Sequence, residues 1–175
     1  MTETSGRITL VIGGAKSGKS LYALNRASAY PGAKAYVATA QAFDAEMEER
    51  IKKHKMERGD GWHTFEEPLG IAETLKEITE THDVIVIDCL TLWLSNLLLG
   101  DADREKEIKS FLSSLVVRHS SQVFIVSNEV GQGIVPDNAL SRQFRDLAGH
   151  LNQKVAHIAD EVYLITAGIP MRIKP

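Results

Sequence analysis

Five short apolar runs recur along the chain, and most show little alternation of apolar and polar positions. Continuous runs rich in Val and Ile are typical of strands that are covered on both faces, as in parallel sheets. The runs predict strands at Arg7–Ile12, Lys34–Ala38, Asp83–Asp88, Gln122–Ser127 and Glu161–Thr166. A last short segment, Met171–Lys174, suits an edge strand.

Helical patterns separate the apolar runs. They predict helices at Lys19–Ala29, Phe43–Arg58, Pro68–Thr79, Asp103–Arg118 and Asp137–Ala159. Pro68 suits the first position of its helix, and Asp137 is a candidate N-cap. Strands that alternate with helices indicate a doubly wound α/β fold, with a mostly parallel sheet and helices on both faces. We find no linker, so residues 1–175 are expected to form a single domain that binds ligands at the C-terminal ends of its strands.

Composition and charge narrow the partners. The chain has 175 residues, 43% of them hydrophobic, and a formal net charge of −3. This charge gives no reason to expect a nucleic-acid partner or binding to an anionic membrane. The N-terminal residues are polar and the apolar runs are shorter than the ~20 residues that span a bilayer, so we expect no targeting segment and no membrane span. The single cysteine, Cys89, is expected to be a buried small side chain and fits a reducing cytoplasm.

The first predicted strand continues into a glycine-rich loop that matches the G-x-x-x-x-G-K-[ST] pattern and precedes a predicted helix. The loop consists of Gly13, Gly14, Ala15, Lys16, Ser17, Gly18, Lys19 and Ser20. Backbone N–H groups of such a loop and the N-terminus of the following helix bind phosphates. Lys19 is expected to reach the β- and γ-phosphates of ATP or GTP, and the Ser20 hydroxyl to ligate Mg²⁺. The pattern in this context predicts a P-loop NTPase fold of the RecA-like type.

Asp88 ends the apolar run VIVID, where a second magnesium ligand is expected in this class. The alternative is an acid that only terminates the strand or caps a helix. The segment that follows is unusually apolar, and its large side chains are expected to pack in the core or between subunits. These are Leu92, Trp93, Leu97, Leu98 and Leu99.

Two common classes of P-loop protein fit poorly. The fourth predicted strand leads into Ser127–Val130, which is not the N-K-x-D motif that reads guanine in switch GTPases. The chain also leaves little room for the separate lid domain of a nucleoside-monophosphate kinase.

Six motifs, the phosphate loop among them, follow one another in the order of a known family. They are GGAKSGKS (Gly13–Ser20), YVATAQ (Tyr36–Gln41), D-x-E-M-x-x-R-I-x-x-H (Asp44–His54), W-x-T-x-E (Trp62–Glu66), SNEVGQGIVP (Ser127–Pro136) and the long string from Phe144 to Pro170. On these motifs the chain resembles the bifunctional adenosylcobinamide kinase / adenosylcobinamide-phosphate guanylyltransferase family of cobalamin synthesis, from residue 7 to residue 174.

The resemblance implies two reactions. A kinase step moves the γ-phosphate of ATP or GTP to the hydroxyl of adenosylcobinamide. A guanylyltransferase step passes GMP from GTP through a histidine, matched here by His54, to adenosylcobinamide phosphate. The resemblance also implies a homotrimer in which the helix Asp44–Arg58 projects outward near a neighbour. The sequence does not show where the corrinoid binds.

The residues around His54 support a nucleophilic role for it. Arg50 and Arg58 flank it at i−4 and i+4, and Lys53 and Lys55 are adjacent. Nearby cations lower the pKa of an imidazole, which keeps it neutral, and they stabilise a departing pyrophosphate. Covalent catalysis then splits one hard transfer into two easier ones. A solvated basic helix face is the alternative.

His54 shares a predicted helix face with Met47, Arg50 and Ile51, because these positions follow the i, i+3, i+4, i+7 spacing. Of the six histidines in the chain, His63 is the nearest rival to His54.

Other nucleotide contacts are expected from three segments. Ala38, Thr39 and Ala40 lie at the end of the second strand, where their backbone groups are expected to contact the nucleotide. The segment Lys55, Met56, Glu57 and Arg58 continues the His54 helix toward the phosphates. Glu66 matches a family position near the guanine, since a carboxylate can accept from guanine N1–H and N2–H, which adenine lacks. The alternative for Glu66 is an acid at the start of the helix at Pro68.

The last strand-and-loop region offers weaker candidates. Asn128 and Glu129 sit at a strand end where site residues gather. The glycines that follow suit a tight loop as well as a plain turn; they are Gly131 and Gly133. Arg142 and Arg145 either add charge to the phosphoryl-transfer site or form a solvated helix face.

Two other functions are consistent with a P-loop. One is a kinase that has lost the transferase step, and the intact His54 argues against it. The other is a non-catalytic nucleotide-binding RecA-like subunit, in which neither Ser20 nor Asp88 would be needed.

Overall fold

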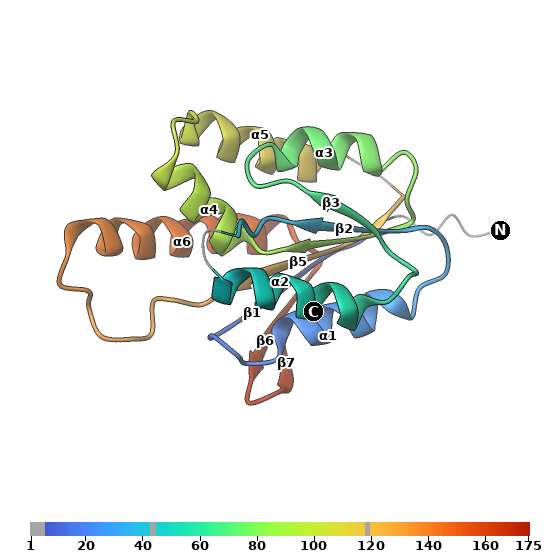
Figure 1. The fold of residues 1–175 in the computed structure, drawn as a ribbon, viewed down its shortest axis with the longest axis horizontal. Helices are drawn as coiled ribbons and strands as arrows, with labels where there is room; N and C mark the ends of the chain where they lie inside the picture. Colours follow the sequence, from blue (N-terminus) through green and yellow to red (C-terminus); the bar gives the residue numbers. More distant parts are fainter. Residues whose placement is uncertain (1–5, 43–44, 118–119) are drawn as a thin grey trace.

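The computed structural model describes residues 6–42, 45–117 and 120–175. Within them the chain forms one seven-stranded sheet between two layers of helices (Figure 1). The strand order is β3-β2-β4-β5-β1-β6-β7. The strands are β1 (Ile8–Gly13), β2 (Lys34–Ala38), β3 (His63–Glu66), β4 (Val84–Asp88), β5 (Gln122–Asn128), β6 (Glu161–Thr166) and β7 (Ile169–Lys174).

All neighbouring strands pair in parallel except β6 and β7, which form an antiparallel hairpin at one edge. The predicted bounds of β2 and β6 are confirmed, and those of β1, β4 and β5 are confirmed to within one residue. The last predicted segment is an edge strand, as expected, and begins two residues earlier, at Ile169. The α/β fold with a mostly parallel sheet is therefore confirmed.

The helices are α1 (Lys19–Ser28), α2 (Ala45–Arg58), α3 (Ile71–Ile78), α4 (Leu90–Leu99), α5 (Arg104–Val116) and α6 (Ala139–Ile158). The apolar face of α1 packs on one side of the sheet, against Phe124 and Val126 among others. Residues of α3, α4, α5 and α6 form a larger core on the other side, in which Trp93 and Phe111 are fully buried and their rings are 5.2 Å apart. Figure 1 shows α3 and α5 above the sheet and α1 below it.

Two predicted helix starts are wrong. Pro68 precedes its helix, because Gly70 is the N-cap of α3 and the Glu67 side chain accepts hydrogen bonds from the N–H groups of Leu69 and Gly70. Asp137 also precedes its helix, since Asn138 is the N-cap of α6 and its Oδ1 accepts from the Ser141 N–H. The predicted helix ends at 43–44 and at 118 lie outside the described residues.

Two elements were not predicted as such. His63–Glu66 is strand β3, so the interpretation of Glu66 as an acid at a helix start is wrong. The apolar segment after Asp88 is helix α4, in which Trp93 and Leu97 are buried as expected. Leu99 is 71% exposed and does not pack in the core, so a contact between subunits stays a prediction for that residue.

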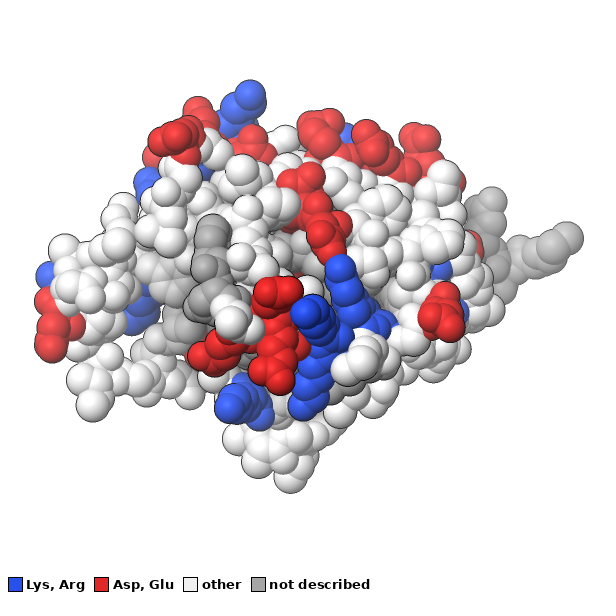
Figure 2. Space-filling model, viewed as in Figure 1, with Lys and Arg blue, Asp and Glu red and all other residues white. Residues whose placement is uncertain are grey.

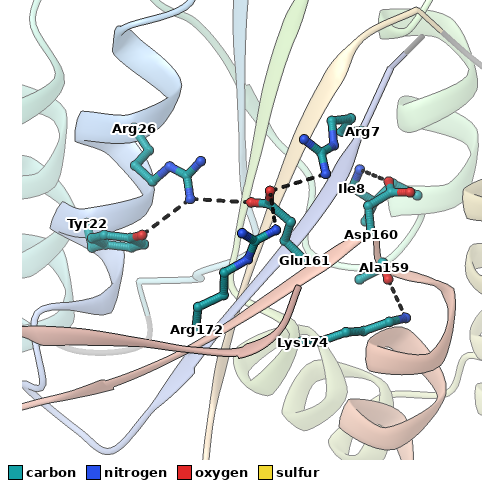
Figure 3. A network of polar contacts seen from close by, with 9 residues as sticks. All are labelled: Arg7, Ile8, Tyr22, Arg26, Ala159, Asp160, Glu161, Arg172 and Lys174. Atoms are coloured by element: carbon teal, nitrogen blue, oxygen red, sulfur yellow. Dashed lines mark hydrogen bonds and ion pairs between the residues drawn. The ribbon is translucent and has the colours of Figure 1, made fainter.

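The C-terminal hairpin pairs with β1 through β6 and is further tied to the rest of the fold by Glu161, the first residue of β6. This buried carboxylate lies within 3.0–3.4 Å of the guanidinium groups of Arg7, Arg26 and Arg172 (Figure 3). The three arginines come from the segment before β1, from α1 and from β7, respectively. One side chain thus joins three parts of the chain that lie far apart in the sequence.

In the part of the chain that the structure describes, no helix combines the length and the apolar character that crossing a membrane would require.

Candidate active site

The phosphate loop connects β1 to α1 and has the backbone that its glycines predict. Gly18 is the N-cap of α1 with φ 95°, a conformation that favours glycine. A Cβ on Gly13 would lie 2.6 Å from the backbone oxygen of Ile165, so this position also requires glycine. The Lys19 ammonium donates to the Gly14 carbonyl oxygen at 2.9 Å, which holds the side chain along the loop. The loop is therefore formed and leaves its helix N-terminus available to phosphate.

A pocket opens beside this loop, at the C-terminal ends of the strands. It is lined by Lys19, Ser20, Tyr36, Ala38, Ala40, Met47, Ile51, Arg58, Asp88, Cys89, Leu92 and Asn128. The pocket brings together residues from the phosphate loop, from β2 and β4, from α2 and from the end of β5. Seven of the predicted site residues are among them: Lys19, Ser20, Ala38, Ala40, Arg58, Asp88 and Asn128.

A second, wider hollow lies between the phosphate loop and the outer side of α2. It is lined by Lys16, Gly18, Lys19, Ser20, Leu21, Glu46, Glu49, Lys52, Lys53, Lys55 and Met56. Figure 2 shows Lys and Arg side chains gathered over this part of the molecule, beside acidic ones, whereas the upper rim is mainly acidic. The predicted residues Lys16, Gly18, Lys55 and Met56 thus face a mixed but locally basic depression.

Asp88 is held by a tyrosine that crosses from the neighbouring strand. The Tyr36 hydroxyl donates to Asp88 Oδ2 at 2.7 Å. Burial, and then the negative charge of Asp88, raise the pKa of Tyr36 well above its ordinary value, so the phenol remains a hydrogen-bond donor. Asp88 lines the pocket with Ser20, and together they offer a carboxylate and a hydroxyl oxygen to a ligand.

Arg58 connects the end of α2 to the same tyrosine. Its guanidinium carbon lies 3.9 Å from the centre of the Tyr36 ring, close enough for a cation–π contact. Its Nη1 is buried and donates to no partner among the described residues. The chain Arg58–Tyr36–Asp88 therefore links the predicted transferase helix to the predicted metal ligand.

Thr39, which was expected to touch nucleotide through its backbone, is engaged within the fold. Its N–H donates to the Asp88 carbonyl oxygen, and its own carbonyl oxygen accepts from the Asn96 side chain. Its hydroxyl donates to the Cys89 carbonyl oxygen and accepts from the Cys89 N–H. Thr39 thus fixes the strand end on which Ala38 and Ala40 line the pocket.

The α2 helix brings the His54 segment to the pocket. Met47 and Ile51, which share the predicted helix face with His54, both line it. His54 lies one turn after Ile51 in α2, and the side chains of Arg50, His54 and Glu57 are outside the described part of the structure.

His63, the rival nucleophile, already has a hydrogen-bond partner. Its Nδ1 lies 2.8 Å from Nε2 of the buried His82, and the two rings meet edge to face.

Glu66 forms an ion pair with Lys55, which connects β3 to α2. The Glu66 and Lys55 side chains are 63% and 47% exposed, so a ligand can compete for either partner. The structure thus places the predicted guanine-binding residue beside the predicted phosphate-binding segment.

The loop after β5 contributes one residue to the pocket. Asn128 lines it, whereas the Glu129 carboxylate accepts from the N–H of Gly131 and shapes the loop. Arg142 donates to the carbonyl oxygens of Pro136 and Asp137, and Arg145 forms an ion pair with Asp146. Neither arginine lines one of the two hollows. This favours the alternative in which both belong to a solvated helix face and not to the phosphoryl-transfer site.

A family model described as cobinamide kinase / cobinamide phosphate guanyltransferase matches residues 9–173. The chain belongs to this family. The bifunctional adenosylcobalamin biosynthesis protein CobP of Pseudomonas aeruginosa is 43% identical over 169 residues, which are 94% of this chain and 96% of the relative. Its counterpart CobU of Escherichia coli K12 is 38% identical over 182 residues, 94% of this chain and 98% of the relative.

Solved structures support the fold of this cobinamide kinase / guanyltransferase family member. The protein PH0250 of Pyrococcus horikoshii OT3 has a TM-score of 0.57 and 12% identity, and the match covers 97% of this chain and 87% of that one. An ATPase from a bacterial type III secretion system has a TM-score of 0.55 and 11% identity, covering 93% of this chain and 51% of that one. At such identities the likeness shows the fold alone.

Five residues that line the pocket of this family member were not predicted to do so: Tyr36, Met47, Ile51, Cys89 and Leu92. One signal was available for Tyr36. A buried tyrosine in an apolar strand needs a partner for its hydroxyl, and the nearest predicted strand end carries Asp88. The pairing of β2 with β4, which puts Ala38 across from Asp88, could not be derived from the sequence alone.

Proposed function

We propose that the chain carries out both reactions of its family. It transfers the γ-phosphate of ATP or GTP to the hydroxyl of adenosylcobinamide, and it then transfers GMP from GTP to the phosphate so formed. The observation that carries the proposal is the shared pocket. Residues of the phosphate loop, Lys19 and Ser20, and residues of the His54 helix, Met47 and Ile51, line the same space.

In the kinase step the chain mainly positions and neutralises charge. The loop N–H groups and the N-terminus of α1 hold the phosphates, and Lys19 lies where its ammonium can turn from Gly14 to the β- and γ-oxygens. Ser20 and Asp88 are the residues that would hold Mg²⁺, whose preference for few protein oxygens and several waters they fit. When bound, the ion would neutralise charge that develops on the phosphates. Tyr36 holds the Asp88 carboxylate in place.

In the transferase step His54 is the proposed nucleophile. Its neutral imidazole attacks the α-phosphorus of GTP, the bond to the β-phosphate oxygen breaks, and pyrophosphate leaves. The acceptor phosphate then displaces the histidine from the GMP group. Lys55 and Glu66 stand beside this helix, one with a charge for phosphate and the other with an acceptor for guanine.

A homotrimer, implied by the family resemblance, is the proposed assembly. Exposed apolar side chains at Ile169, Met171 and Ile173 on the edge strand β7 suit a protein contact. Sedimentation velocity gives the molar mass directly, and a monomer at micromolar concentration would contradict this part of the proposal.

The proposed function is tested by supplying the substrates one at a time. The purified protein, Mg²⁺, adenosylcobinamide and ATP should yield a phosphorylated corrinoid, and added GTP should convert it to the GDP derivative with release of pyrophosphate. Mass spectrometry identifies both products. Lys19→Ala should lower the first step by about a hundred-fold or more, as loss of a charge-stabilising donor does.

Each outcome separates the alternatives. Phosphorylation without GMP transfer would leave a single-activity kinase. Tight nucleotide binding without either product would leave a nucleotide-binding subunit, and the proposal would be wrong.

A further inference from the structure

Asn128 lines the pocket beside the phosphate loop. It is the last residue of β5, paired in register with Gly13, the first residue of the phosphate loop, on the neighbouring strand β1. On its other side β5 pairs with β4, which ends in Asp88. Asn128 thus lies between the strand ends that carry the phosphate loop and the proposed metal ligand, and it lines the pocket together with Lys19 and Asp88.

The backbone of Asn128 is fixed from two directions. Its N–H donates to the Thr91 hydroxyl oxygen of α4 at 2.7 Å, and its carbonyl oxygen accepts from the Asn152 side-chain amide of α6 at 3.1 Å. Asn152 is itself 8% exposed, and the next residue of the chain, Glu129, donates its N–H to the Gly13 carbonyl oxygen. Two helices and the first strand therefore hold the backbone at Asn128. The pairing of β5 with β4 has already ended at Val126.

The Asn128 side chain has an acceptor that the folded chain does not use. Its Oδ1 is buried and has no hydrogen-bond partner among the described residues. An unsatisfied buried polar atom costs about 1–3 kcal/mol, and native proteins seldom leave one without a reason. The backbone of the residue is anchored but its side-chain torsions are not, so a rotation of the amide can turn this oxygen toward the pocket that the residue lines. A ligand that brings a hydrogen-bond donor would satisfy it.

The chemistry of the kinase step limits the choice of donor. The phosphate oxygens of a nucleoside triphosphate are acceptors, so they do not satisfy an amide oxygen. The Lys19 ammonium already has the Gly14 carbonyl oxygen and is needed for the phosphates. The hydroxyl group of the phosphoryl acceptor is a donor, and it must come within reach of the γ-phosphorus in this space.

We propose that the Asn128 amide receives the hydroxyl of the phosphoryl acceptor and orients it for transfer, and that Asn128 serves the kinase step but not the GMP transfer. This inference rests on the proposed function and assigns a residue within it. The hydroxyl donates its hydrogen to Oδ1, which directs an oxygen lone pair toward the γ-phosphorus. The new O–P bond forms as the bond to the β-phosphate oxygen breaks. The nucleoside diphosphate leaves with the bonding electrons, and the hydroxyl proton is released to water.

Asn128→Ala tests the proposal because the two activities can be measured separately on one protein. With ATP and adenosylcobinamide, kcat for phosphate transfer should fall by about 10- to 100-fold, the worth of one well-placed hydrogen bond in the transition state, while KM for ATP changes little. With GTP labelled at the α-phosphate and no corrinoid, the amount and rate of protein labelling should stay close to wild type. Normal labelling also shows that the variant is folded.

Asn25→Ala is the matched control, since Asn25 is an exposed residue of α1 away from both hollows, and both measurements should stay at wild-type values. Asn128→Ser, which keeps a side-chain oxygen, should give a kcat between those of Asn128→Ala and wild type.

Two results would overturn the inference alone. One is wild-type phosphate transfer by Asn128→Ala. The other is an equal fall of phosphate transfer and labelling in both Asn128 variants, which would make Asn128 a general nucleotide or folding residue. A wild-type protein that does not phosphorylate the corrinoid would instead overturn the proposed function, and this inference with it.

Discussion

Asp88 and its neighbours show how single residues adapt an apolar strand end to polar chemistry. The carboxylate follows a fully buried run, yet it is satisfied by the Tyr36 hydroxyl and opens onto the pocket. The next residue, Cys89, is buried and 5% exposed, as the sequence predicted for a single cysteine in this position. The same apolar surroundings that shape the site also suppress ionisation of the thiol.

Cys89 gives a pH-dependent prediction at the residue scale. Burial, and then the charge of Asp88, raise the pKa of the thiol from its ordinary value of 9.0 to about 11. Between these values the unfolded chain has lost the thiol proton and the folded chain has kept it, so the free energy of unfolding falls as pH rises. The contribution of the thiol to the free energy of unfolding is fully present below pH ~9. About 3 kcal/mol of it is lost by pH ~11.

Urea titrations of wild type and Cys89→Ala at several pH values between 8 and 11 measure this effect. The slope of the free energy of unfolding against pH reports the difference in bound protons between the unfolded and folded chains. The wild type should lose stability more steeply than the variant. Parallel curves for the two proteins would show that the thiol titrates normally in the fold.

At the scale of elements, the predictable parts were those with a strong local pattern. The central strands β1, β4 and β5 are continuous Val- and Ile-rich runs, and the phosphate loop has glycines that its backbone requires. Strand β3 has one partly buried apolar side chain, Phe65, in four residues, so its pattern is too weak to recognise. Helix α4 is apolar on most sides because it packs between β5 and α6, and an all-apolar segment has no helical period.

The site residues also divide into those that a local sequence pattern predicts and those that only the packing of elements brings together. The loop residues Lys19 and Ser20 and the strand end Asp88 were predictable, because motif and strand position specify them. The contact of Arg58 with Tyr36 and the ion pair of Lys55 with Glu66 were not, because they depend on how α2 packs across β2 and β3. That packing joins segments without a shared sequence pattern.

The ion pair between Lys55 of α2 and Glu66 of β3 leads to a prediction for Glu66. If its carboxylate turns from Lys55 to accept from guanine N1–H and N2–H, Glu66→Gln should raise the GTP concentration for half-maximal protein labelling by about 10-fold or more, since a hydrogen bond to a charged group is lost. The ATP dependence of phosphate transfer should change much less. Glu77→Gln, a change on the exposed side of α3, is the control. An unchanged GTP requirement would exclude Glu66 from guanine binding.

For the whole molecule, the network around Glu161 joins the start of β1, helix α1 and the C-terminal hairpin (Figure 3). The carboxylate side chain is 8% exposed and its three arginine partners are 30–51% exposed. Removal of the buried partner leaves three guanidinium groups without their shared counter-charge. Glu161 is the first residue of β6, whereas the pocket lies at the C-terminal ends of the strands. We therefore assign the network a structural role.

Glu161→Gln should therefore lower the free energy of unfolding by about 2–4 kcal/mol, somewhat less than a fully buried pair because the arginines are partly solvated. Urea denaturation measures the difference. Glu73→Gln, which breaks an exposed pair with Lys76 on α3, is the matched control and should cost at most about 0.5 kcal/mol. Equal effects of the two substitutions would contradict the role assigned to the network.

The central claim concerns the whole molecule, because it unites a phosphate loop and a transferase helix in one protein with two activities. The rival nucleophile His63 is hydrogen-bonded to His82, whereas the helix of His54 contributes Met47 and Ile51 to the pocket of the phosphate loop. A covalent GMP adduct on His54 distinguishes this arrangement from a kinase that has lost the transferase step and from a non-catalytic nucleotide-binding subunit.

The most direct measurement is to incubate the protein with Mg²⁺ and GTP labelled at the α-phosphate, denature it, and assay label on the chain. The account predicts an acid-labile, alkali-stable adduct in the wild type and in His63→Ala, and none in His54→Ala. Label that persists in His54→Ala, or a wild type that binds GTP without becoming labelled, would contradict it.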